Sequence, residues 1–261
     1  MELYVDGDCI FVDSTHRGGA MEAPPLAAVD CTNLVLSRLP ETEYQALRPD
    51  LEFFPTPAKT VLFHRDEEIT HIYFPLSGCH SVLAVMQNGA AVEVGTIGNE
   101  GLSTVDVLTG STVATETTVC QIPSDNLRIP TAQFKRALEN NPELRHLSYR
   151  FLQGYLSHIS QSVACNRLHS TEERFARWIL ASEDRVGANE FPLTQEYLAD
   201  MLGVHRPSVS VIARRFQQAG LLDYRRGVVT VLDRRGLEAA ACECYAEVKK
   251  QFARVLGKPL G

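Results

Sequence analysis

Two clusters of arginine and hydroxyl side chains in the C-terminal third of the chain could bind a polyanion. One cluster consists of His205, Arg206, Ser208, Ser210 and Arg214, and the other of Arg225 and Arg226. A guanidinium group donates paired hydrogen bonds to phosphate oxygens or to the O6 and N7 atoms of guanine, and serine can serve any base. These residue types are therefore suited to contacting a nucleic acid.

The charge distribution agrees with this chemistry. The net charge is −7, yet residues 204–235 hold seven arginines against two aspartates. Residues 1–100, by contrast, hold five lysines and arginines against fifteen acidic residues. A basic segment in an acidic chain suggests a face for a polyanion, although charge alone fits a solvated arginine-rich surface equally well.

The segment 193–216, LTQEYLADMLGVHRPSVSVIARRF, predicts two helices joined by a tight turn. Thr194 can cap the first helix and contact phosphate, and Gly203 permits the left-handed turn that ends it. Ala199 is small where the helices would cross, and Val209 and Ile212 would face the first helix. These constraints at fixed offsets indicate a helix-turn-helix rather than an ordinary helical hairpin, and place the N-terminal half of the second helix in a major groove.

A hairpin is predicted after the second helix. The residues LLDYRRGVVTVLD, 221–233, give two short strands around a turn at Arg225-Arg226-Gly227. A two-stranded wing with arginines at its tip fits phosphate contact beside the helix-turn-helix. The competing interpretation is a solvated turn.

The preceding part of the chain changes from strands to helices. Short β-rich runs between residues 51 and 129 predict an antiparallel barrel or jelly roll, and Asn88-Gly89 predicts a type I′ hairpin turn. Asn141-Pro142 then starts a helix of some 24 residues with apolar residues at positions 152, 155, 159 and 163. Its length favours pairing with its copy in a dimer over a place in a single core. A capping box, Ser170–Glu173, opens the next helix.

The motifs of residues 31–237 resemble the Crp/Fnr family of bacterial transcription regulators. The resemblance is carried by YFPLSG (73–78), VEVGTIGNEG (92–101), LTQEYLADMLGVHRPSVS (193–210), the long helix, the wing and the tail LEAAACECY (237–245). It implies an α+β fold: an antiparallel β jelly-roll sensor, a long dimerisation helix and a C-terminal winged helix-turn-helix. The expected domains are an extension (1–30), the sensor (31–139), the dimerisation helix (140–168), the DNA-binding domain (169–237) and a helical tail (238–261).

The resemblance also implies partners and a location. The expected partners are double-stranded DNA with a palindromic operator, a second copy of the chain, an effector of unknown identity and, as a further candidate, RNA polymerase. No membrane partner is expected, and the predicted location is the cytoplasm. A sensor or scaffold with a degenerate DNA-binding domain is the alternative from another functional class. No catalytic array or phosphate-binding glycine loop supports an enzyme.

The candidate effector pocket departs from the family's cyclic-nucleotide pattern. Gly98, Glu100 and Gly101 resemble the glycine–glutamate part that meets a ribose, and Glu116 and Thr117 lie where the cationic partner is expected. Thr117 and Thr118 are candidate pocket residues that can donate hydrogen bonds. Residues 108–120 contain no lysine or arginine. A buried phosphate without a cation is costly, so we expect no cyclic nucleotide to bind.

The cysteines give no cofactor assignment. Cys9 and Cys31 are too far apart for the clustered pattern of the iron–sulfur members, and the seven cysteines form no CxxC pair. They are expected to be reduced thiols. A two-thiol site at Cys242 and Cys244 is conceivable, but a packed or exposed pair is favoured. The sequence therefore assigns no cofactor and no metal ligand.

Overall fold

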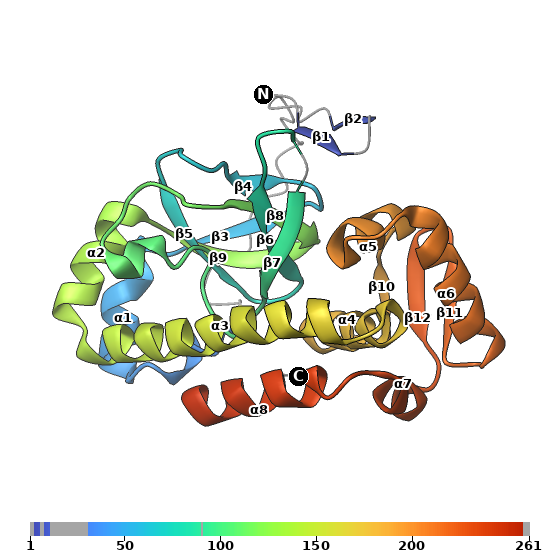
Figure 1. Ribbon diagram of the computed structural model, residues 1–261. Coiled ribbons are helices and arrows are strands. Elements are labelled where there is room, and N and C mark those ends of the chain that lie inside the picture. Colours follow the sequence, from blue (N-terminus) through green and yellow to red (C-terminus); the bar gives the residue numbers. More distant parts are fainter. Residues whose placement is uncertain (1–2, 6–7, 11–30, 90, 258–261) are drawn as a thin grey trace. The chain divides into compact units, whose positions relative to one another are not determined.

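The computed structural model describes residues 3–5, 8–10, 31–89 and 91–257 (Figure 1). The predicted extension 1–30 lies largely outside them, apart from a small hairpin of β1 (Leu3–Val5) and β2 (Asp8–Ile10). The chain forms two compact units, residues 1–91 with 96–152 and residues 92–95 with 153–261. None of the described helices has the length and hydropathy of a membrane span.

The first unit is built on two antiparallel sheets, as predicted for a jelly roll. One sheet has the order β3-β9-β5, with β3 Glu52–Thr56, β5 His71–Pro75 and β9 Ser124–Pro130. The other has the order β4-β8-β6-β7, with β4 Val61–Phe63, β6 Cys79–Val85, β7 Ala91–Ile97 and β8 Thr117–Ile122. Strands distant in sequence thus lie side by side.

Aromatic and branched side chains fill the core of this unit. Ile72, Phe74, Ile129 and Phe134 are fully buried, and the rings of Phe74 and Phe134 meet edge to face at 5.8 Å. Phe134 belongs to α2 (Thr131–Asn140), which follows β9 directly. The other helical segments here are α1 (Glu41–Leu47), η2 (Leu36–Arg38), η3 (Arg48–Asp50) and η4 (Asp106–Thr109).

The turn between β6 and β7 differs from the prediction. A type I′ turn needs positive φ at both central residues. Only Gly89 has it here, with φ of 85°, and the Gly89 N–H donates to the Met86 carbonyl at 3.0 Å. The predicted adjacency of the two strands is correct, but the type I′ assignment of Asn88-Gly89 is wrong.

The long helix α3 spans Pro142–Leu168 and starts where the Asn-Pro signal predicts. Its 27 residues make it about 40 Å long. Tyr155 does not lie on an open apolar face, because it is 3% exposed and packs against Gly95. The large exposed apolar side chains on α3 are Tyr149, Leu156, Val163 and Leu168.

The second unit is a winged helix with helical additions. It contains α4 (Thr171–Val186), α5 (Gln195–Leu202), α6 (Arg206–Gln218), α7 (Arg234–Ala240) and α8 (Cys244–Leu256). The capping box predicted at Ser170 is present, with Glu173 as its reciprocal partner. The predicted two-stranded wing, β11 (Leu222–Arg225) and β12 (Val228–Val231), carries a third strand, β10 (Glu190–Pro192), paired with β12. The Phe175 ring of α4 and the Phe216 ring of α6 stack with their centroids 5.3 Å apart.

Candidate nucleic-acid interface

The helix-turn-helix has the predicted caps and turn. The Thr194 hydroxyl accepts a hydrogen bond from the Tyr197 N–H at 3.2 Å and so caps α5. Gly203 ends that helix with φ of 62°, and after Val204 and His205 the helix α6 begins at Arg206. A left-handed residue closes the turn within three residues, which brings α5 and α6 together at a short connection.

Small and branched residues hold the two helices against each other. Ala199 on α5 is 5% exposed, and Val209 and Ile212 on α6 are 0% and 7% exposed, as the pattern predicts. The Ser210 hydroxyl donates to Gln195 Oε1 on α5 at 2.6 Å. Ser210 is therefore engaged inside the motif, and Gln195 is a supporting residue that the sequence pattern did not reveal.

The outer side of α6 presents a set of open polar side chains. His205, Arg206, Ser208 and Arg214 are all exposed. Within the part of the chain that the structure describes, neither Arg206 nor Arg214 makes an ion pair. Their neighbour Arg215 does, with Glu172 at 3.2 Å. The N-terminal turn of α6, the positive end of the helix dipole, thus carries an uncompensated guanidinium, which suits an anionic partner.

The wing places a further cation at its tip. Arg226 and Gly227 have φ of 52° and 77°, the conformation of a two-residue type I′ turn. Arg226 is exposed, whereas Arg225, also exposed, pairs with Asp223 at 3.0 Å. The wing is tied to the segment just before α5, because the Tyr224 hydroxyl donates to the Leu193 carbonyl at 2.6 Å. Burial raises the pKa of Tyr224, so this hydroxyl stays protonated.

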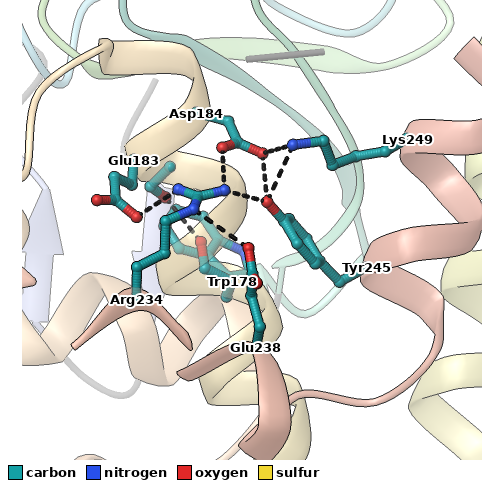
Figure 2. Close-up of polar contacts among 8 residues, drawn as sticks. Trp178, Glu183, Asp184, Arg234, Glu238, Tyr245 and Lys249 are labelled. Carbon is teal, nitrogen blue, oxygen red and sulfur yellow. Dashed lines mark hydrogen bonds and ion pairs between the residues drawn. The ribbon is translucent and has the colours of Figure 1, made fainter. Parts of the chain in front are cut away.

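One of the seven arginines, which is partly exposed, is bonded to several side chains of its own unit (Figure 2). Arg234 contacts Glu183 Oε2 at 2.6 Å, Asp184 Oδ1 at 2.7 Å and the Tyr245 hydroxyl at 2.5 Å. Lys249 reaches the other Asp184 oxygen at 3.0 Å. The positive charge counted over residues 204–235 is therefore partly neutralised by acids of the same unit. Arg206 and Arg214 of α6, Arg226 of the wing and Arg235 of α7 are exposed and carry what remains toward solvent.

The candidate effector residues lie around buried turns and strand β8. Glu100 is fully buried, and Gly101 sits where an added Cβ would lie 1.9 Å from the Phe151 ring, so close packing requires glycine there. The Gly98 carbonyl accepts from the Gly101 N–H at 3.3 Å. Thr117 and Thr118 are both buried at the start of β8.

The basic side chains near β8 are a neutral histidine and an arginine that interacts with two acids. His80 on β6 lies next to β8, opposite Cys120, and its ring contacts the Ser103 hydroxyl at 2.6 Å. Burial lowers the pKa of His80 to about 3, so the ring is neutral at physiological pH. Arg65, which sequence spacing did not single out, interacts with Glu116, whose pKa is raised by burial. Arg65 also pairs with Asp66 at 3.7 Å.

Comparison with known proteins identifies the class of the molecule. A family model described as a cyclic nucleotide-binding domain matches residues 55–141, and one described as a Crp-like helix-turn-helix domain matches residues 173–240. The chain is thus a transcription regulator with a β domain of the cyclic nucleotide-binding type and a Crp-like helix-turn-helix domain. It belongs to the Crp/Fnr family.

Individual relatives agree with this assignment. The transcriptional activator protein FnrA of Stutzerimonas stutzeri is 24% identical over 193 residues, 69% of this chain and 76% of the relative. FixK2 from Bradyrhizobium japonicum superposes with a TM-score of 0.63 at 14% identity, over 74% of this chain and 98% of that one. A Crp/Fnr-family regulator from Eubacterium rectale gives a TM-score of 0.60 at 19% identity, over 79% and 96%. The two solved structures support the fold.

Proposed function

We propose that this Crp/Fnr regulator binds a specific, palindromic operator through α6 and the wing. The observation that carries the proposal is the pair Arg206 and Arg214, exposed on α6 and free of ion pairs among the described residues. An arginine in the first turn of a recognition helix can reach guanine O6 and N7 in the major groove. The function is therefore gene regulation by direct base contact.

The other candidate contacts divide by chemistry. His205 and Ser208 lie beside Arg206 and are assigned to the bases or the nearby phosphates. Thr194, Arg225 and Arg226 are assigned to the sugar-phosphate backbone, Arg225 with its charge partly offset by Asp223. Ser210 is the weakest of the predicted contacts, because its hydroxyl is bonded to Gln195.

A footprinting experiment separates this function from that of a scaffold with a degenerate DNA-binding domain. Purified full-length protein is incubated with fragments of its own genome, and bound fragments are selected and footprinted. The proposal expects a small set of sites with two related half-sites about one helical turn, roughly 34 Å, apart. Retention of no fragment above random DNA would favour the scaffold.

We further propose that the regulator is a homodimer paired along α3. Tyr149, Leu156 and Val163 recur every seven residues on that helix and are 49%, 55% and 68% exposed. A seven-residue apolar repeat is the seam of a two-helix coiled coil. A dimer presents two copies of α6 to a palindrome, and RNA polymerase remains a candidate further partner in the cytoplasm.

The dimer is tested by placing a charge in the apolar seam. Leu156→Glu should convert dimers to monomers in multi-angle light scattering, because a carboxylate cannot be buried without a partner. Leu156 is a better position for this test than Ile159, because Ile159 is already partly buried within its own chain. Leu156→Met keeps an apolar side chain and should leave the dimer intact. A Leu156→Glu protein that stays dimeric would move the interface elsewhere.

The signal sensed is proposed not to be a cyclic nucleotide. Residues 108–120 offer no lysine or arginine, His80 is neutral, and Arg65 faces Glu116 and Asp66. Thr117 and Thr118 could donate only neutral hydrogen bonds, which contribute less than charge-assisted ones. Isothermal titration calorimetry with cyclic AMP and cyclic GMP should show no binding at micromolar concentrations. Micromolar binding that also strengthens operator binding would contradict the proposal.

A further inference from the structure

Three cysteines and a histidine that are distant in sequence meet in the second unit. Cys165 lies in the last turn of α3 and His169 just after it, whereas Cys242 and Cys244 lie between α7 and the start of α8. One ligand atom from each of the four residues lies within 4.8 Å of those of the others. The chain thus returns over about 75 residues to place all four groups together.

The distances fit a single tetrahedral ion. Sulfur and nitrogen bind Zn²⁺ at about 2.3 and 2.0–2.1 Å, which puts neighbouring ligands of a tetrahedron about 3.8 Å apart for two sulfurs and about 3.6 Å apart for sulfur and nitrogen. The Cys165 and Cys242 sulfurs are 3.6 Å apart, and Cys244 Sγ lies 3.4 Å from His169 Nδ1. The four groups are already near the separations that one zinc ion would impose.

The surroundings of the four groups resemble those of a metal site. The Nε2 atom of His169 lies 3.1 Å from a carboxylate oxygen of Glu243, the outer contact that commonly orients a metal-binding histidine. Gln161 Nε2 donates to Cys244 Sγ at 3.0 Å. Arg177 interacts with Cys165, and Arg174 with Cys165 and Cys242, so positive charge faces the sulfurs.

Burial separates this cluster from a chance group of surface ligands. Cys165, Cys242 and Cys244 are 0%, 4% and 0% exposed, while His169 is half-buried. Three sulfurs and one imidazole form the ligand set of a closed structural zinc site. Larger clusters of several metal atoms need wider ligand separations than these.

We propose that Cys165, His169, Cys242 and Cys244 bind one structural Zn²⁺ ion. On binding, the three thiols release their protons and each thiolate, together with the neutral imidazole, donates an electron pair to the metal. The ion would fasten the segment between α7 and α8 to the end of α3. This site is independent of the proposed DNA contacts, none of which belongs to the cluster.

Metal content of the tag-free, full-length protein is the first test. Protein purified without chelators should contain about one zinc per chain by inductively coupled plasma mass spectrometry, and Cys242→Ser should lose most of it. Cys31→Ser, a cysteine of the other unit, should keep it. Wild-type protein that cannot be loaded above the level of Cys242→Ser, or that carries a Cys165–Cys242 disulfide when freshly purified, would overturn the proposal.

A second test needs no change in the buried residues. Glu243 is 77% exposed at its side chain, so Glu243→Gln should fold normally and weaken zinc binding by about 10- to 100-fold in competition with a chelator. Glu247→Gln, in the first turn of α8, should have no such effect. Replacement by Co²⁺ should give the intense visible absorption of tetrahedral sulfur ligation in the wild type. An unchanged zinc affinity in Glu243→Gln together with an octahedral Co²⁺ spectrum would refute the site.

Discussion

The arginines of the winged helix differ in their partners, and the two extremes are the unpaired arginines of α6 and the wing tip on one side and Arg234 of α7 on the other. Arg206, Arg214 and Arg226 are exposed and make no ion pair among the described residues. Arg234 contacts two carboxylates and a tyrosine hydroxyl within 2.7 Å (Figure 2). A guanidinium with its partners inside the chain holds the fold together, whereas one without partners is available to a ligand.

The difference also explains how an acidic protein can bind DNA. Asp184 and Glu183 are 7% and 11% exposed at their side chains, so the acids that face Arg234 are largely removed from the surface. On the helix and the wing that carry the free arginines, Asp223 pairs with Arg225 and Glu172 pairs with Arg215. Local pairing, rather than net charge, decides which face attracts a polyanion.

Removing Arg234 should give the largest effect on folding. Arg234→Ala leaves Glu183 without a cation and leaves Asp184 paired only with Lys249. We expect the free energy of unfolding to fall by about 2–3 kcal/mol. The loss is smaller than for a fully buried pair, because Arg234 is partly exposed. Urea denaturation measures the change. Arg206→Ala should stay within about 0.5 kcal/mol of the wild type. Equal stability of the two variants would contradict the claim that Arg234 stabilises the fold and Arg206 does not.

Removing Arg206 should give the largest effect on recognition. Arg206→Ala is expected to weaken operator binding by about 1–3 kcal/mol while random DNA is affected much less, because a bidentate base contact is lost. Competition binding against random DNA measures the ratio. Arg215→Ala on the same helix is the control, since Arg215 already pairs with Glu172. A specificity ratio unchanged in Arg206→Ala would remove Arg206 from the base-reading residues.

Ser208 and Ser210 test the same distinction with neutral groups. Ser210→Ala loses the hydrogen bond to Gln195 and should lower the unfolding free energy by about 1 kcal/mol. Ser208→Ala should leave stability unchanged and affect only operator binding. Thermal unfolding and binding assays on both variants measure these effects, and a reversal of the two outcomes would exchange the roles assigned to the serines.

The helix-turn-helix was predictable because its constraints are local. Thr194, Ala199, Gly203 and Val209 lie within sixteen consecutive residues, and caps, turns and helical faces depend on such short separations. The start of α3 at Pro142 and the capping box at Ser170 were predictable for the same reason.

Contacts between distant segments were not predictable from one sequence. Arg234 pairs with Glu183 and Asp184, which lie about 50 residues earlier in the chain. Counting charges over residues 204–235 alone therefore overstated the positive charge that is free at the surface. Cys165 and His169 join Cys242 and Cys244 only because α3 and the segment before α8 meet. Tyr155 likewise belongs to the apolar spacing 152, 155, 159 and 163 that the sequence offers for a dimer face, but tertiary packing buries it.

Removing Arg226 from the tip of the wing should give the smallest effect. It should change the salt dependence of DNA binding rather than its sequence specificity. Arg226→Ala removes a single phosphate contact, so the slope of log affinity against log salt should fall in magnitude by about 0.9. Because a phosphate carries no sequence information, specific and random DNA should lose affinity by the same factor. Fluorescence anisotropy over a series of salt concentrations measures both. Lys250→Ala on α8 removes the same charge elsewhere and should leave the slope unchanged. An unequal loss for the two DNAs would make Arg226 a base or groove reader, whereas an unchanged slope would leave its guanidinium solvated and α6 as the main contact.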